Sequence, residues 1–175
     1  FCMWITEDVY EKIGEKLQDE YSKLPKSYKG ITRVDTIMAE GRVGVCVVED
    51  FYKKYTGSGD GNLTLEQWIN LEDYKIATVT NGEVFRDDLG YFSKIRRKFE
   101  NQPFQARLVK LARQLGAMAQ TGQSNYERAM ARKDYVSANI CISEFIKCTM
   151  HCIYILNGMY SPYYKWMAAG IKKYK

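Results

Sequence analysis

With 175 residues, of which 46% are hydrophobic, the chain is long enough to bury a core as one large domain or as two small ones. Its 13 Gly and 3 Pro are too few for a fibrous or disordered protein. The net charge of +5 suits an anionic ligand but does not demand nucleic acid, for which a concentrated basic stripe is expected.

Two apolar runs in the first third predict β-strands, at residues 1–5 and 43–48. Between them, Thr6 predicts the N-cap of a helix that stops at Pro25, and residues 27–42 are expected to be irregular. Because the chain opens on Phe rather than Met, and a first strand needs partners, we expect it to be a fragment whose remaining strands lie upstream.

The rest of the chain predicts helices. Residues 57–62 (GSGDGN) form the expected boundary loop, and Thr64 with Gln67 has capping-box spacing for a helix at Leu65–Asn70. Further helix starts are predicted at Asp87–Asp88, Pro103, Ser124, Asp134 and Ser161–Pro162, with a bend or break at Gly122. The pattern over residues 71–80 does not decide between helix and irregular structure. The fold class is therefore α+β, mainly α, with an α/β remnant over residues 1–57 and a helical bundle over 58–175.

Residues 107–132 combine an apolar helical face with a polar one. Leu108, Leu111 and Leu115 recur at helical spacing, and Lys110 and Gln114 lie on the other side. A polar cluster follows, made of Gln120, Gln123, Asn125, Tyr126, Arg128 and Arg132. Such a face is either solvated surface or one wall of a pocket for a phosphate-bearing or sugar-like ligand. Without further information, solvated surface is the favoured interpretation.

Residues 135–156 are long enough to cross a membrane, but polar side chains interrupt them. Asn139, Glu144, Lys147 and His151 would each be costly in lipid, so we expect no membrane association and a buried helix of a soluble protein. Glu144, Lys147 and His151 also share one helix face. They are either an acid–base set in a cleft or a polar stripe, and the polar stripe is favoured.

Cysteine usage favours a cytoplasmic protein. The five Cys are odd in number and contain no CxxC pair, which argues against a disulfide framework. No signal peptide is recognisable. Cys148 and Cys152 lie one helical turn apart beside His151, but one helix rarely supplies more than two zinc ligands, so small buried side chains are the favoured interpretation.

Other metal motifs are incomplete. Residues 60–66 resemble the second half of a calcium-binding EF-hand loop, yet Thr56 and Ser58 stand where carboxylates are needed, so a turn with a helix cap is favoured. Two-metal phosphoryl transfer needs carboxylates on alternate residues of a strand, and the chain contains no such pair.

Several blocks, in one order, resemble the C-terminal domain of bacterial nucleotidyltransferase-like proteins, a domain of unknown function. They are GEVFRDDLGYFSKIRRKF (82–99), QTGQSNYERAMARKD (120–134) and SPYYKW (161–166), with VEDFY (48–52) and the opening FCMWITEDVYEKIGEKL upstream. The resemblance covers nearly the whole chain. It implies a polymerase-beta-type nucleotidyltransferase, in which a small sheet holds Mg²⁺ and a nucleoside triphosphate (NTP) and a helical domain closes the cleft.

The resemblance also implies what this chain lacks. The Gly-Ser turn and the alternating acids of the superfamily precede the first strand, so the sheet is incomplete. Mg²⁺ and NTP are expected for the intact parent and not for this fragment alone. Glu49, or Asp50 beside it, is the candidate third carboxylate.

The same resemblance turns the polar cluster into candidate substrate-binding residues. They are Gln120, Gln123, Asn125, Tyr126, Arg128, Arg132, Lys165 and Trp166, with Arg86, Asp87 and Tyr163 behind them. The expected partners are a nucleotide and an acceptor, which is a small molecule, an RNA or a protein. The alternative is a non-catalytic ligand- or protein-binding module. A third, weaker possibility is nucleic-acid binding through Arg96, Arg97, Lys98, Arg107 and Lys110.

Overall fold

The computed structural model describes residues 2–32 and 43–172. These residues form helices joined to a few short strands, all within the first 47 positions, which confirms an α+β protein that is mainly α. The chain divides into two compact units, Phe1–Asn62 with Val84–Ile95, and Leu63–Glu83 with Arg96–Lys175. The domain boundary predicted between residues 57 and 58 stays a prediction.

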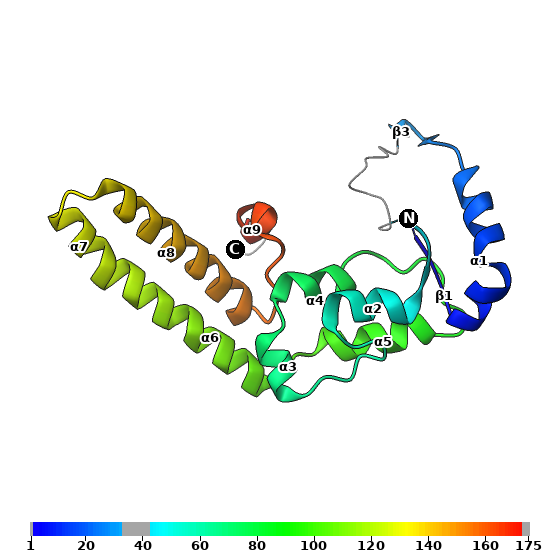
Figure 1. Ribbon diagram of the computed structural model, residues 1–175, viewed down its shortest axis with the longest axis horizontal. Coiled ribbons are helices and arrows are strands. Elements are labelled where there is room, and N and C mark those ends of the chain that lie inside the picture. Colours follow the sequence, from blue (N-terminus) through cyan, green and yellow to red (C-terminus); the bar gives the residue numbers. More distant parts are fainter. Residues whose placement is uncertain (1, 33–42, 173–175) are drawn as a thin grey trace. The chain divides into compact units, whose positions relative to one another are not determined.

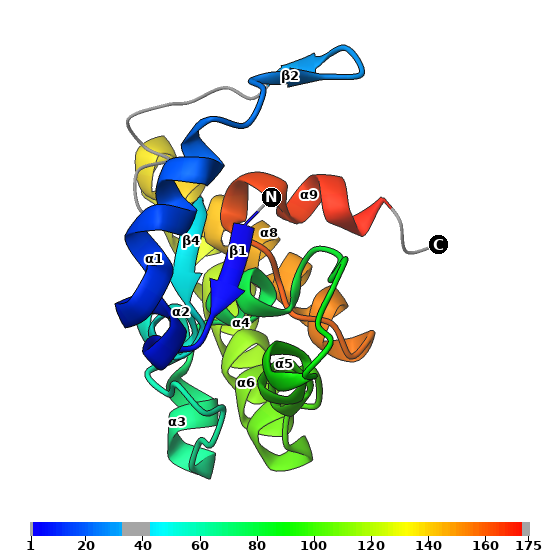
Figure 2. The ribbon, with the colours of Figure 1, turned by 90° about the vertical axis from the view of Figure 1, so that its right-hand side faces the viewer.

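The first unit is built on a parallel strand pair. Strand β1 (Cys2–Ile5) lies beside β4 (Gly44–Val47), with Cys2 opposite Gly44 and Ile5 opposite Val47, so the predicted common sheet is confirmed. Helix α1 (Glu7–Ser22) lies between the two strands in sequence, as a parallel connection requires, and packs against β4 (Figure 2). The Gln18 side chain fixes this contact, because its Oε1 accepts a hydrogen bond from the Val45 N–H at 2.9 Å.

One local prediction in this unit is wrong, and another is confirmed only in part. Strands β2 (Ser27–Tyr28) and β3 (Ile31–Thr32) pair antiparallel where irregular chain was expected, while residues 33–42 lie outside the described residues. The hairpin forms because Lys29 and Gly30 both adopt positive φ, as a two-residue type I′ turn requires. Thr6 occupies the N-cap of α1, but its hydroxyl donates to Asp8 Oδ1 at 2.5 Å instead of accepting from a helix N–H.

Aromatic side chains form the core of the first unit. Helix α2 (Val48–Thr56) contributes Phe51, whose ring lies 4.1 Å from Trp4 of β1 and 6.3 Å from Phe92, centroid to centroid. Tyr52 is fully buried and donates a hydrogen bond to the Phe92 carbonyl at 3.2 Å. Because Phe92 belongs to residues 84–95, this cluster joins the second segment of the unit to the sheet.

Short helices open the second unit. Helix α3 (Leu65–Asn70) begins with the predicted capping box of Thr64 and Gln67, which is confirmed. Helix α4 (Asp73–Thr80) follows directly, so the undecided stretch is helical. Helix α5 (Tyr91–Glu100) carries Phe99, which is fully buried and contacts the Trp68 ring of α3.

A long helical hairpin makes up most of the second unit. One arm runs through α6 (Phe104–Met118), the π-helical segment η2 (Ala119–Asn125) and α7 (Tyr126–Ala131). The other arm is α8 (Tyr135–Leu156), which packs along all three (Figure 1). Asp134 caps α8 as predicted, by accepting from the Ser137 N–H at 3.0 Å. Helix α9 (Tyr164–Ile171) packs against α8.

A bend or break was predicted at Gly122, with a new helix start at Ser124; the break and the new start are wrong, and the bend stays a prediction. The helix continues through them, and its turn widens over η2 (Figure 1). Gly122 serves a different purpose: a Cβ at this position would lie 2.7 Å from the Phe145 ring of α8. The glycine therefore allows close packing of the two arms and does not end the helix.

The prediction that α8 is a buried helix is also wrong. Val136 is 73% exposed and Ile140 is 64% exposed, and Ile146 and Leu156 are exposed as well. Within residues 2–32 and 43–172, α8 is the one helix long and apolar enough to cross a membrane by length and composition, a test that helices of soluble proteins also pass. Its other face packs on α6, η2 and α7. The cytoplasmic localisation stays a prediction.

We expect Gly122→Ala to destabilise the protein by about 1–3 kcal/mol, because the new methyl group would meet Phe145. Gly116→Ala in α6 is the matched control: no atom lies within 4 Å of the position that its new methyl group would take, so the higher helix propensity of Ala should stabilise by up to about 1 kcal/mol. Urea unfolding followed by circular dichroism measures both. Equal effects of the two substitutions would contradict the packing role of Gly122.

Candidate functional site

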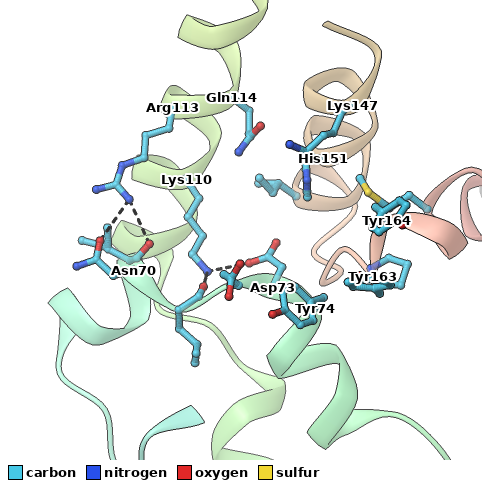
Figure 3. A pocket seen from close by; sticks show the side chains of 16 residues that line it. Asn70, Asp73, Tyr74, Lys110, Arg113, Gln114, Lys147, His151, Tyr163 and Tyr164 are labelled. Carbon is cyan, nitrogen blue, oxygen red and sulfur yellow. Dashed lines mark hydrogen bonds and ion pairs between the residues drawn. The ribbon is translucent and has the colours of Figure 1, made fainter. Parts of the chain in front are cut away.

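The second unit contains a pocket of about 430 Å³. Its walls are the α3–α4 connection, one face of α6, the second half of α8 and the segment leading into α9 (Figure 3). The lining residues are Ile69, Asn70, Leu71, Glu72, Asp73, Tyr74, Lys110, Arg113, Gln114, Lys147, His151, Ile155, Pro162, Tyr163, Tyr164 and Met167. We take this pocket as the candidate site because it is large, concave and polar on several sides.

A buried ion pair forms part of the wall. Lys110 of α6 is 8% exposed, and its Nζ donates to Asp73 Oδ1 at 2.7 Å and to the Leu71 carbonyl at 2.6 Å (Figure 3). Both side chains of the pair are about nine-tenths buried, so each charge depends on the other. The pair therefore ties the start of α4 to the middle of α6.

The remaining cations of the pocket are held more loosely. Arg113 Nη1 lies 3.3 Å from the Ile69 carbonyl and 3.5 Å from Asn70 Oδ1, both long for hydrogen bonds. Lys147 of α8 lies 3.3 Å from both carboxylate oxygens of Glu144, in an exposed pair. Both cations can turn toward a ligand at small cost.

His151 faces the same pocket from α8. Its Nδ1 lies 2.8 Å from Ser161 Oγ, and Ser161 is fully buried. Burial lowers the pKa of His151, with the charge of Lys147 acting in the same direction and Asp73 and Glu144 opposing it. The imidazole is therefore neutral at pH 7.

Tyrosines line the side of the pocket near α9. The Tyr163 ring lies 5.5 Å from that of Tyr74 and 4.6 Å from that of Tyr164, centroid to centroid. Burial, followed by the charge of Glu72, raises the pKa of Tyr74, so its hydroxyl stays protonated at neutral pH. The three rings offer flat apolar surface next to hydroxyl groups.

The sequence-predicted substrate residues lie mostly elsewhere. Asn125, Arg128 and Arg132 line a second cavity of about 290 Å³ with Ala129, Ser137 and Cys141, near the turn of the hairpin. Gln120 and Gln123 are exposed on η2, and Tyr126 is half-buried. Lys165 and Trp166 are exposed on α9, next to Tyr164 and Met167 of the pocket. Of the eight predicted substrate-binding residues, the structure thus brings three together around one cavity.

Glu49, the predicted third carboxylate, lies in the first unit. Its Oε1 accepts a hydrogen bond from the Tyr91 hydroxyl at 2.5 Å, which raises the pKa of Tyr91 to about 12. Its Oε2 is buried, and no partner is found for it within the described residues. Arg86 pairs with Asp88, and Asp87 accepts from the Ser93 N–H of α5 at 2.7 Å, so Asp87 acts as a helix cap.

The described residues do not form a metal site. No group of three His, Cys, Asp or Glu side chains within residues 2–32 and 43–172 is placed to hold a metal ion. In the loop that resembles half an EF-hand, Asp60 accepts from Ser58 Oγ at 2.8 Å and from the Asn62 N–H at 3.0 Å. These are the bonds of a turn, as favoured from the sequence.

Among the pocket residues of α6, Arg113 was not predicted as a site residue, whereas Lys110 and Gln114 belong to the face predicted as either solvated surface or a pocket wall. Lys110, Arg113 and Gln114 have the spacing of one helix face, which is a usable signal. Asp73, which pairs with Lys110, precedes it by 37 positions, and no local pattern connects them.

The fold and the pocket define the second unit as a helical domain with a polar, tyrosine-lined cavity. Residues 68–167 match the family described as "Domain of unknown function (DUF4037)", and the chain belongs to this family. Every residue that lines the pocket, from Ile69 to Met167, lies inside the matched range. No curated protein and no solved structure matches the chain. This match agrees with the resemblance seen in the sequence, which also included a domain of unknown function. The match assigns no activity to the chain.

Lys110→Met should destabilise the second unit by about 3–5 kcal/mol, because it leaves the Asp73 carboxylate buried without its partner. The double variant Lys110→Met/Asp73→Asn should recover part of this loss. Lys75→Met removes the more exposed pair with Glu72 and should cost less than about 1 kcal/mol. Urea unfolding compares the three variants, and equal costs for the Lys110 and Lys75 substitutions would contradict the role of the buried pair.

The lowered pKa of His151 predicts that the folded protein loses stability in mild acid. Its folded-state pKa lies below its ordinary value of 6.5, so the contribution is complete above pH 6.5 and is lost as the pH falls through the lowered pKa. Unfolding free energies measured from pH 7.5 to pH 5 should fall for the unsubstituted chain and fall less for His151→Gln. Asp87 and Asp134 also have lowered pKa values, but their ordinary value of 3.8 already lies below this pH range. Parallel pH profiles of the two chains would contradict the assignment.

Proposed function

We propose that the pocket binds a small anionic ligand with a ring, and that it forms the nucleotide or acceptor side of a Mg²⁺-dependent nucleotidyltransferase in the intact parent. The observation that carries the proposal is the composition of the pocket. Arg113 and Lys147 supply positive charge, Gln114 supplies an amide, and Tyr74, Tyr163 and Tyr164 supply ring surfaces around about 430 Å³. That volume is in the range of small-molecule sites.

The chemistry of such a ligand fits these side chains. A phosphate group gains charge-assisted hydrogen bonds from Arg and Lys, and a planar ring or sugar packs against tyrosine. In Figure 3, Gln114 from α6 and Lys147 from α8 extend into the space between the two helices. The residues of this chain would therefore bind and orient the ligand, and Tyr surfaces would exclude water from its ring.

The catalytic part of the proposal rests on the sequence resemblance. Mg²⁺ would activate the phosphoryl group, and the paired carboxylates that hold it would come from outside residues 1–175. Glu49 supports a role as a third carboxylate only through its buried Oε2, which lacks a partner among the described residues. One carboxylate is not a magnesium site, so we derive no step through the metal.

The second candidate is a non-catalytic interaction module. The exposed apolar side chains of α8, among them Val136, Ile140 and Ile146, support it, because apolar side chains on a helix surface can bind another protein. Such a module would bind its partner through this face of α8, and the pocket would remain empty of nucleotides.

Ligand binding tests the first candidate against the second. ATP, GTP, CTP and UTP with Mg²⁺ are titrated into the chain, with melting temperature and calorimetry as readouts, because a ligand of the native state raises its melting temperature. We expect Arg113→Ala to weaken the best ligand about tenfold or more, as loss of a charged hydrogen bond does.

Arg128→Ala is the matched control, since Arg128 is an exposed arginine at the second cavity and outside the pocket. It should leave nucleotide affinity unchanged. No shift with any nucleotide would contradict the proposal. An effect of Arg128→Ala with none of Arg113→Ala would move the site to the cavity predicted from the sequence.

A further inference from the structure

The hydrogen bond between His151 and Ser161 decides what the pocket presents to a ligand. His151 lines the pocket, whereas Ser161 does not, and Ser161 is fully buried. The 2.8 Å contact joins Ser161 Oγ to Nδ1 of the imidazole. The Nδ1 edge of the ring therefore faces the protein interior, and the opposite edge, with Nε2, faces the pocket.

The direction of this bond follows from what Ser161 can bind. Within the described residues its hydroxyl has no other hydrogen-bond partner, so its proton needs His151 as an acceptor. A buried hydroxyl proton without an acceptor costs about 1–3 kcal/mol. Nδ1 can accept only when it is unprotonated, and in a neutral imidazole the proton is then on Nε2. Burial lowers the pKa of His151, which agrees with a neutral ring.

The two carboxylates that line the pocket are each paired with a lysine. The Asp73 carboxylate accepts from Lys110, and Glu72 pairs with Lys75 at 2.9 Å. Glu144, which does not line the pocket, lies beside Lys147 and Cys148 on α8. The pocket also holds two cations with only long or exposed contacts, Arg113 and Lys147, and the Nε2–H of His151 adds a neutral donor beside them.

We propose that the pocket selects a phosphoryl group, held by the Nε2–H of His151 together with Arg113 and Lys147, and rejects amine-bearing ligands. A phosphoryl oxygen accepts hydrogen bonds and donates none, so it matches three donors without leaving an unpaired proton. A protonated amine would meet the like charges of Arg113 and Lys147, while the carboxylates of Glu72 and Asp73 are already paired with lysines. Ser161 is a positioning residue in this arrangement, since it acts by fixing the tautomer. The inference rests on the proposed function of the same pocket.

Nuclear magnetic resonance tests the tautomer directly. His151 is the only histidine of the 175 residues, so ¹⁵N–¹H correlations of the ring contain one set of signals. We expect the Nε2–H tautomer in the unsubstituted chain, a rise in Nδ1–H population in Ser161→Ala, and no change in Ser143→Ala, an exposed serine of the same helix as His151. An Nδ1–H tautomer in the unsubstituted chain would overturn the inference, whatever the pocket binds.

Binding of simple probes tests the selectivity. Inorganic pyrophosphate and ADP, with adenosine and spermidine as uncharged and cationic counterparts, are titrated into the chain. We expect the two phosphates to bind, His151→Ala to weaken them about tenfold, and His151→Gln, which restores an N–H donor, to recover part of that loss. Binding of spermidine but not of the phosphates would overturn the inference, although the pocket would still be a ligand site. Failure of every probe would overturn the proposed function and the inference with it.

Discussion

The pocket depends on one buried ion pair, that between Lys110 and Asp73. A lysine ammonium inside a protein is stable only where a carboxylate and further oxygen atoms surround it, and here the Asp73 carboxylate and the Leu71 carbonyl meet that need. Because this ion pair joins the two segments, the α3–α4 connection must stay against the middle of α6. The connection then forms one wall of the cavity, and the hairpin and the segment leading into α9 form the others.

The same pair sets the electrostatic character of the cavity. The Asp73 carboxylate is paired with Lys110 and the Glu72 carboxylate with Lys75, so neither adds an uncompensated negative charge to the cavity. Arg113 and Lys147 keep long or exposed contacts, and His151 is held by a serine that ligand cannot reach. A pocket whose carboxylates are paired with lysines and which holds two further cations favours oxyanions, which is the physical basis of both proposals.

The hairpin supports this site through its packing. Gly122 lets the η2 segment approach the Phe145 ring, and the widened turn keeps the arm continuous from α6 into α7. The arm and α8 therefore hold Arg113 and Lys147 on facing helices. The opposite surface of α8 stays apolar and exposed at Val136 and Ile140, which gives the domain a second surface of different chemistry.

The sequence by itself determined the mainly helical class, the two strands β1 and β4, the capping box at Thr64 and the cap at Asp134, because hydrophobic period and capping chemistry are local. It also placed Arg128 and Arg132 on one face, since residues four apart on a helix are neighbours. Only the tertiary structure decided that Gly122 packs instead of breaking a helix, that α8 is exposed on one side, and that Lys110 meets Asp73. Those outcomes depend on contacts between distant segments, which local propensity does not encode.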